Sequence, residues 1–106
     1  MKKYKFNILG NEYTLSFKTE KYSTNNTLAV DAYDAKDNEW FGTVTVNLSD
    51  PRQIEKDHAF FDINNFGKRF LDQIVAHGLA EMPKDGYTRG SGWVEYPLVK
   101  WNTKKF

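Results

Sequence analysis

The sequence predicts an α+β fold, an antiparallel β-sheet meander of five to six strands with one amphipathic α-helix packed on one face. Residues 27–48 alternate strictly between apolar and polar side chains, which is the pattern of a half-buried strand pair. Only the segment that begins after Asn65 has apolar residues at helical spacing. Because this helix follows the main group of strands instead of alternating with them, the order favours α+β in a single domain over 1–106.

The N-terminal half is predicted to form two β-hairpins. Every second side chain is apolar in residues 3–9, and the alternation continues through residues 12–19 after the turn Gly10-Asn11. The longer alternating segment turns at residues 35–38, where aspartate and asparagine tolerate left-handed backbone angles. Its predicted inner face consists of Leu28, Val30, Ala32, Trp40, Gly42, Val44, Val46 and Leu48.

The C-terminal half is predicted to hold the helix and a closing strand. A proline-containing charged loop leads to residues 58–63, which form a candidate extra strand. Asn65 is the expected helix N-cap and Gly78 the expected end. The last strand, residues 92–101, is expected at a sheet edge or with a bulge, because Pro97 cannot donate a backbone hydrogen bond. The apolar stripe of the helix consists of Phe66, Phe70, Leu71, Ile74 and Val75.

The composition narrows the class of protein. The chain has no cysteine, which excludes disulfides, thiolate metal sites and thiol nucleophiles, and which fits a reducing compartment. No segment approaches the roughly 20 consecutive apolar residues that a membrane-spanning helix needs. We therefore expect a cytoplasmic protein with no membrane partner.

The sequence offers little for catalysis. None of the serines lies in a Gly-x-Ser-x-Gly turn, and no glycine-rich loop leads into a helix. His58 and His77 lack metal-ligand spacing, although Asp57 and Asp62 flank the first of them. His77 instead suits the carboxyl end of the helix. Carboxylate acid–base catalysis is a weaker alternative, so we expect no enzyme, no cofactor and no metal.

Charge and aromatic side chains are the features that point to binding. Residues 1–30 carry five lysines against two glutamates, residues 31–62 three basic against eight acidic residues, and residues 63–106 seven basic against four acidic. The acidic middle is either a solvated edge or a face for a basic partner. Aromatic residues make up 16% of the chain, and they either fill a ring-rich core or leave some rings at a binding surface.

Five segments spread over nearly the whole chain form a characteristic set. They are YSTNNTLAV at 22–30, GTVTVNL at 42–48, AFFDINN at 59–65, Gly78-Leu79 and GWVEYPL at 92–98. This set resembles a family of small bacterial proteins, catalogued as a domain of unknown function, that conjugative plasmids, integrative elements and phages carry. Val44 departs from the expected leucine.

The resemblance transfers no catalytic residues. It implies an accessory protein of a mobile genetic element, and some such proteins inhibit host defence systems, CRISPR effectors included. An acidic surface would suit the basic nucleic-acid channel of such an effector.

We therefore expect a small non-enzymatic protein that binds a protein partner with a basic surface. The alternative is single-stranded nucleic-acid binding through Lys3, Lys5 and Lys18 together with exposed rings. The oligomeric state stays open. The residues expected to contact a protein partner are Asp31, Tyr33, Asp34, Asp37, Glu39 and Phe41.

Overall fold

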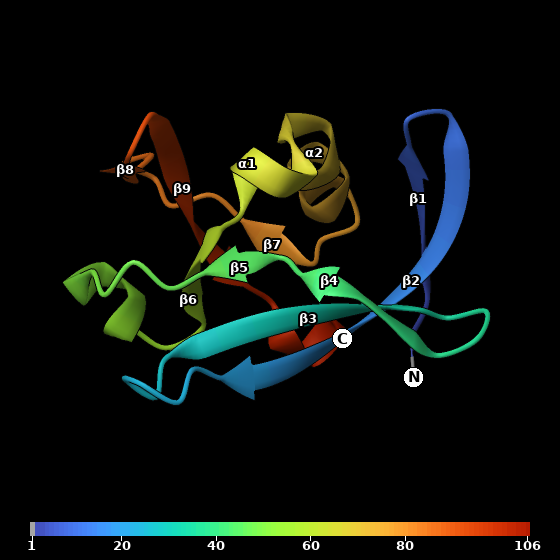
Figure 1. Cartoon of the computed structure of the whole chain (residues 1–106), viewed down its shortest axis with the longest axis horizontal. Helices are drawn as coiled ribbons and strands as arrows, with labels where there is room; N and C mark the ends of the chain where they lie inside the picture. Colours follow the sequence, from blue (N-terminus) through green and yellow to red (C-terminus); the bar gives the residue numbers. More distant parts are fainter. Residues whose placement is uncertain (1) are drawn as a thin grey trace.

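The computed structural model describes residues 2–106 and arranges them as two antiparallel sheets with two short helices (Figure 1). The first sheet has the order β1-β2-β3-β4, with β1 (Tyr4–Ile8), β2 (Asn11–Lys21), β3 (Leu28–Asp34) and β4 (Glu39–Thr43). The second has the order β5-β6-β9-β7, with β5 (Thr45–Val46), β6 (His58–Phe61), β9 (Val94–Trp101) and β7 (Ala80–Glu81), and β8 (Thr88–Ser91) also pairs with β9. The helices are α1 (Ile63–Phe66) and α2 (Lys68–Ala76), with 3₁₀ turns η1 (Pro51–Ile54) and η2 (Thr103–Lys105).

Antiparallel sheets with short helices agree with the predicted α+β class, but a single meander of five to six strands is wrong. The strand expected to run through to residue 48 passes from one sheet to the other. Val44, between β4 and β5, donates its amide to the Val30 carbonyl in the first sheet at 2.9 Å. Its own carbonyl accepts from the amide of Asp62, just after β6, at 2.8 Å. One residue therefore links the two sheets.

The β1–β2 turn lies one residue earlier than predicted. Ile8 pairs with Asn11, so Leu9 and Gly10 are the two turn residues rather than Gly10 and Asn11. Both have positive φ, 51° and 83°, as a type I′ turn requires.

A β-bulge in the β3–β4 hairpin reverses the predicted facing of two aromatic residues. Ala32 pairs with Gly42 but Tyr33 pairs with Trp40, so Phe41 is the extra residue. Phe41 consequently packs against the core, and Trp40 is 62% exposed. The sequence pattern predicts the reverse, with Trp40 inward and Phe41 outward.

The close approach of α1 explains the position of this bulge. A Cβ on Gly42 would lie 2.8 Å from the ring of Phe66, so only glycine admits that ring. Phe41, beside it, contributes its ring to the same cluster, with its centroid 6.4 Å from those of Phe66 and Phe70. Because of the bulge, the neighbouring residues Phe41 and Gly42 both contact the helices.

The closing strand is central, whereas an edge position or a bulge was predicted, and its pairings show no register shift. β9 pairs with β6 through residues 98–100, and with β8 and β7 through its two ends. Pro97 fits because the amide of its neighbour Leu98 bonds the Tyr87 carbonyl, which turns the proline nitrogen away from β8. On the other side, the pairing with β6 stops at Leu98, so no acceptor lacks its donor there.

The predicted helix is two helices. Asp62, not Asn65, is the N-cap of α1, and its carboxylate accepts from the Asn65 amide. Gly67, with φ 84° and ψ 164°, separates α1 from α2. Gly78 ends α2 as predicted, because the Gly78 amide bonds Val75 and the Leu79 amide bonds Ile74 in a Schellman motif. Val75 departs from the predicted stripe and is 39% exposed.

One hydrophobic core joins both sheets and α2. The candidate strand at 58–63 is confirmed as β6, and Leu79 is buried at the end of the core. Most of the aromatic rings lie in or against this core, whereas Trp40 and Trp93 are exposed. Among residues 2–106, no helix has the length and apolar character needed to cross a bilayer. The buried members of the core include Phe6, Leu15, Phe17, Val30, Ala32, Val44, Phe61, Phe70, Ile74, Leu79, Val99 and Trp101.

Candidate protein-binding surface

The β3–β4 hairpin brings together five of the six residues predicted to bind a partner, and Trp40 replaces the sixth. Tyr33 and Trp40 are cross-strand partners and therefore lie on the same, outer face of the sheet. Asp31 shares this face two residues earlier along β3. Phe41 lies on the inner side, against Phe70. Asp34 and Glu39 form the next pair of the ladder, so they point to the opposite face of the hairpin, and Asp37 lies in the turn. We call the following residues, which lie on both faces of the hairpin, the hairpin surface: Asp31, Tyr33, Asp34, Asp37, Glu39 and Trp40.

Three of its carboxylates accept hydrogen bonds within the hairpin, two of them from the backbone. Asp34 Oδ1 accepts from the Lys36 amide at 3.0 Å, and Asp37 Oδ1 accepts from the Glu39 amide at 3.1 Å. These are the local side-chain bonds that make aspartate common in turns. Asp31 accepts from the Thr43 hydroxyl at 2.6 Å. Each bond uses an acceptor lone pair and leaves the negative charge in place.

These carboxylates make no ion pair among the described residues, although Lys18 lies across the ladder from Asp31. Within residues 2–106, Asp31, Asp34, Asp37 and Glu39 make no ion pair within 4.0 Å, while seven ion pairs form elsewhere. Asp34 also lies directly across the ladder from Glu39, and like charges opposite each other are unfavourable. The hairpin surface thus combines four carboxylates that have no close ion pair with an exposed indole.

Two of the lysines of the nucleic-acid alternative lie at β1, and the third contacts an aromatic ring of the hairpin. Lys3 and Lys5 are exposed at the edge strand β1 or next to it, and Lys5 Nζ is 4.0 Å from Glu12. Lys18 lies over the ring of Tyr33, 4.7 Å from its centroid. The outer face of the sheet therefore carries both signs of charge, in contrast to the uniformly basic groove of a typical single-strand binder.

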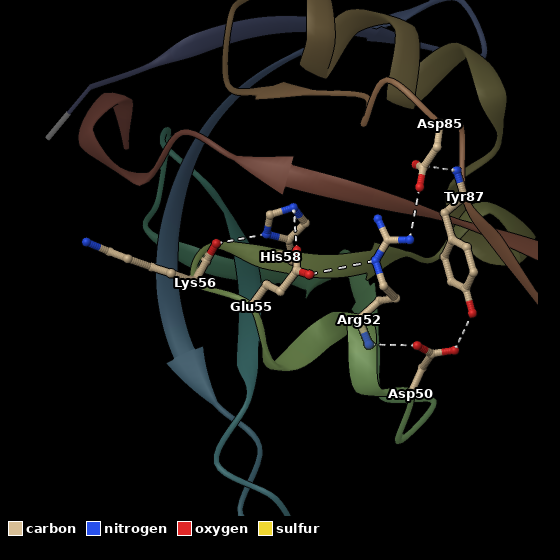
Figure 2. Close-up of polar contacts among 7 residues, drawn as sticks. All are labelled: Asp50, Arg52, Glu55, Lys56, His58, Asp85 and Tyr87. Carbon is tan, nitrogen blue, oxygen red and sulfur yellow. Dashed lines mark hydrogen bonds and ion pairs between the residues drawn. The ribbon is translucent and has the colours of Figure 1, made fainter.

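A second cluster contains carboxylates that are paired with arginines (Figure 2). Asp50 is 2% exposed, and its carboxylate accepts from the Arg52 amide at 2.8 Å, from the Tyr87 hydroxyl at 2.8 Å and from Arg89 Nη1 at 2.7 Å. Arg52 also donates to Asp85 at 3.0 Å, and its guanidinium lies 4.7 Å from the centroid of the Tyr87 ring. We call these five residues the Asp50 cluster. They fasten η1 to the start of β8.

The pKa directions in the Asp50 cluster follow from these contacts. Burial would raise the pKa of Asp50, but the bonds from the Arg52 amide, Arg89 and Tyr87 outweigh it and hold that pKa below its ordinary value. The hydrogen bond from Arg52 likewise lowers the pKa of Asp85. The bond to Asp50 raises the pKa of the Tyr87 hydroxyl. Near neutral pH the cluster is a fixed carboxylate with a neutral phenol, an arrangement that suits stability better than proton transfer.

The two histidines occupy different settings. His58 opens β6, with Nδ1 2.9 Å from the Lys56 carbonyl and Nε2 3.6 Å from Glu55 (Figure 2). Its nearby carboxylate is therefore Glu55 and not Asp57 or Asp62. His77 caps the carboxyl end of α2, as the sequence predicts, and its Nε2 lies 2.7 Å from the Lys5 carbonyl in β1. Across residues 2–106, no three metal-binding side chains gather.

Sequence reasoning missed Trp40 and the Asp50 cluster. No local signal identified the first, because alternation puts one of the adjacent residues Trp40 and Phe41 inward without showing which, and the bulge that decides it lies against the distant Phe66. For the second, Tyr87 and Arg89 lie 37 and 39 residues from Asp50, so no local pattern connects them.

Comparison with known proteins bears on the family alone. Neither the curated proteins nor the solved structures contain a match to this chain. The model of a domain of unknown function, DUF4313, matches residues 16–106, which include the hairpin surface and the Asp50 cluster. Because the match covers well over half of the sequence, the chain belongs to the DUF4313 family.

Proposed function

We propose that this protein is non-enzymatic and acts by binding a protein partner through the hairpin surface. The observation that carries the proposal is an exposed tryptophan, Trp40, on a hairpin whose four carboxylates make no ion pair among the described residues. Exposed tryptophans dominate the binding energy of many interfaces, because they bury a large apolar area at low entropic cost. Uncompensated carboxylates around such an anchor select a partner by charge.

The sign of the charge determines the kind of partner. A basic surface would relieve the repulsion between Asp34 and Glu39 and pair with Asp31 and Asp37. The acceptor atoms that bond the turn backbone retain further lone pairs for arginine or lysine donors. The proposed partner is therefore a protein with a basic patch and a pocket for an indole ring.

The biological setting is part of the same proposal. The family resemblance suggests an accessory protein of a mobile genetic element that works in the bacterial cytoplasm. A host defence protein with a basic nucleic-acid channel, such as a CRISPR effector, has the surface chemistry that the hairpin surface would recognise. Inhibition of such an effector by occupying its channel is the proposed mode of action.

The test is affinity capture from a bacterial host lysate, with and without nuclease, read by mass spectrometry. We expect one dominant protein that survives nuclease. The triple reversal Asp34→Lys, Asp37→Lys and Glu39→Lys should abolish its capture, and Trp40→Ala should weaken it by at least tenfold, because the indole is the proposed anchor.

A matched control separates specific contacts from net charge. The triple variant Glu12→Lys, Glu81→Lys and Glu95→Lys changes the charge by the same amount at exposed sites outside the hairpin. It should capture the partner as the wild type does. Undiminished capture by the hairpin variant, with folding verified by circular dichroism, contradicts the proposal. Capture that vanishes with nuclease favours the alternative, in which Lys3, Lys5 and Lys18 bind single-stranded nucleic acid.

A further inference from the structure

A groove separates the β1–β2 turn from the junction of α1 and α2. It has a volume of about 720 Å³. Ile8, Leu9, Phe66 and Phe70 supply its apolar surface. Figure 1 shows the turn of the β1–β2 hairpin on the same side of the molecule as α2. The groove lies outside the hairpin surface, and none of the contacts described above uses it.

Leu9 is placed against every local preference. It is 97% exposed, and its φ of 51° is a left-handed value that bulky residues rarely adopt. Asparagine, aspartate or glycine is the usual residue at the first position of a type I′ turn. A leucine there strains the backbone and exposes an apolar side chain, and among residues 2–106 no close contact covers that side chain. Strain of this kind is characteristic of ligand-binding positions.

The walls of the groove are held rigidly. Gln73 of α2 accepts from the Asn7 amide at 2.7 Å and donates to the Asn7 carbonyl at 2.9 Å, which blocks the free edge of β1. His77 holds the Lys5 carbonyl in the same way, one turn further along α2. The distance between the hairpin and the helix is thus fixed before any partner arrives, and a fixed groove binds with less loss of entropy.

The charge at the rim indicates what the groove accepts. Lys68 and Arg69 line it, and Asp72 is the single acidic residue of the lining. Asp72 pairs with Lys68 at 3.0 Å, whereas Arg69 makes no ion pair within residues 2–106. The rim therefore presents one uncompensated guanidinium beside an apolar floor, and a guanidinium binds a carboxylate in a bidentate manner.

We propose that this groove is a second docking site, and that its occupant is an apolar peptide segment of a partner protein that carries a carboxylate. The apolar side chains of the segment pack against Ile8, Leu9 and Phe66, and its carboxylate pairs with Arg69. This site is independent of the hairpin surface, whose charge has the opposite sign.

A display selection tests the proposal. The immobilised protein is used to select from a random twelve-residue peptide library on phage. We expect enriched peptides that combine at least two large apolar residues with an aspartate or glutamate. A synthetic peptide of the enriched sequence is then titrated against the wild type and variants by fluorescence anisotropy.

Two groove variants and one control make the titration decisive. Leu9→Asn keeps the turn, because asparagine favours left-handed angles, and Arg69→Gln removes only the charge. Each should raise the dissociation constant at least tenfold. Trp93→Ser, at the exposed tip between β8 and β9, and Trp40→Ala should leave it unchanged, which also separates this site from the hairpin surface.

Three results would overturn the assignment. They are no enrichment, enriched peptides that are basic or lack an acidic residue, and binding that neither groove variant weakens. Concentration-dependent dimerisation that Leu9→Asn and Arg69→Gln both abolish would identify a second copy of this chain as the occupant instead.

Discussion

The Asp50 cluster and the hairpin surface both contain aspartates, and they use these carboxylates in opposite ways. Asp50 is buried and bonded to two side chains and an amide, and Arg52 ties Asp85 to the same cluster. Asp37 and Glu39 are exposed, and no cation of the described chain pairs with them. The hairpin surface, Asp50 and Arg52 belong to the acidic segment 31–62, and the other members of the Asp50 cluster contact that segment.

The difference teaches that charge composition does not reveal the role of a carboxylate. A buried carboxylate contributes to folding only if donors replace its lost water, and Asp50 has three such donors. An exposed carboxylate contributes little to folding, and its charge remains free for a partner. The acidic middle of the sequence therefore contains both a carboxylate that stabilises the fold, Asp50, and a candidate binding surface, the hairpin surface.

Removing Asp50 should produce the largest effect that this comparison predicts. Asp50→Ala eliminates the N-cap of η1 and two bonds to side chains, which should lower the free energy of unfolding by about 3 kcal/mol. The equivalent change Asp37→Ala should cost less than about 0.5 kcal/mol, because the residue is exposed. Urea denaturation followed by tryptophan fluorescence measures both. Equal losses would show that the two regions do not differ in the way proposed.

Local pattern could predict the elements of the fold but not how they combine. Alternation identifies the strands on either side of the turn at 35–38, and the glycine at 78 marks the helix end, because those features depend on neighbouring residues. β5 and β7 are two residues long and are strands only through their partners β6 and β9. The division into two sheets is thus a tertiary property that no short window contains.

The candidate site was predictable to a similar degree. Its carboxylates follow from turn chemistry and from the charge of the hairpin. The exchange of Trp40 for Phe41 depends on the bulge, and the bulge depends on the ring of Phe66 against Gly42, more than twenty residues away. Asp50 is likewise an ordinary loop aspartate in the sequence, and only the folded chain supplies Tyr87 and Arg89.

The pH dependence of the free energy of unfolding should also distinguish the Asp50 cluster from the hairpin surface. Because the folded pKa values of Asp50 and Asp85 lie below their ordinary values, the unfolded chain binds more protons in acid than the folded chain does. The stability that these groups contribute is therefore present above about pH 4 and is lost as the pH falls through their folded pKa values.

The measurement is urea denaturation at a series of pH values between 7 and 2.5. Asp50→Asn, which cannot titrate, should be less stable than the wild type at pH 7 and should lose less stability on acidification. Asp37→Asn is the control and should follow the wild-type curve. If Asp50→Asn and the wild type lose stability in parallel, the acid sensitivity arises elsewhere.

The smallest predicted effect concerns the hairpin, where removing three charges should make the protein slightly more stable. Asp34→Asn, Asp37→Asn and Glu39→Gln together remove three charges, and the asparagine oxygens can still accept from the Lys36 and Glu39-position amides. Relief of the repulsion across the Asp34–Glu39 pair should raise the free energy of unfolding by a few tenths of a kcal/mol, on the order of 0.3.

The dependence of stability on salt concentration distinguishes relief of charge repulsion from an improvement in packing. Raising sodium chloride from 10 mM to 0.5 M screens exposed charges, so it should stabilise the wild type by a similar amount and the triple variant less. Scanning calorimetry at both salt concentrations resolves the difference. A loss of more than about 1 kcal/mol in the variant would mean that these carboxylates hold the fold, as Asp50 does. A small gain that salt abolishes would instead mean that the free protein retains an unfavourable cluster of charge, which is what a surface kept for a basic partner requires.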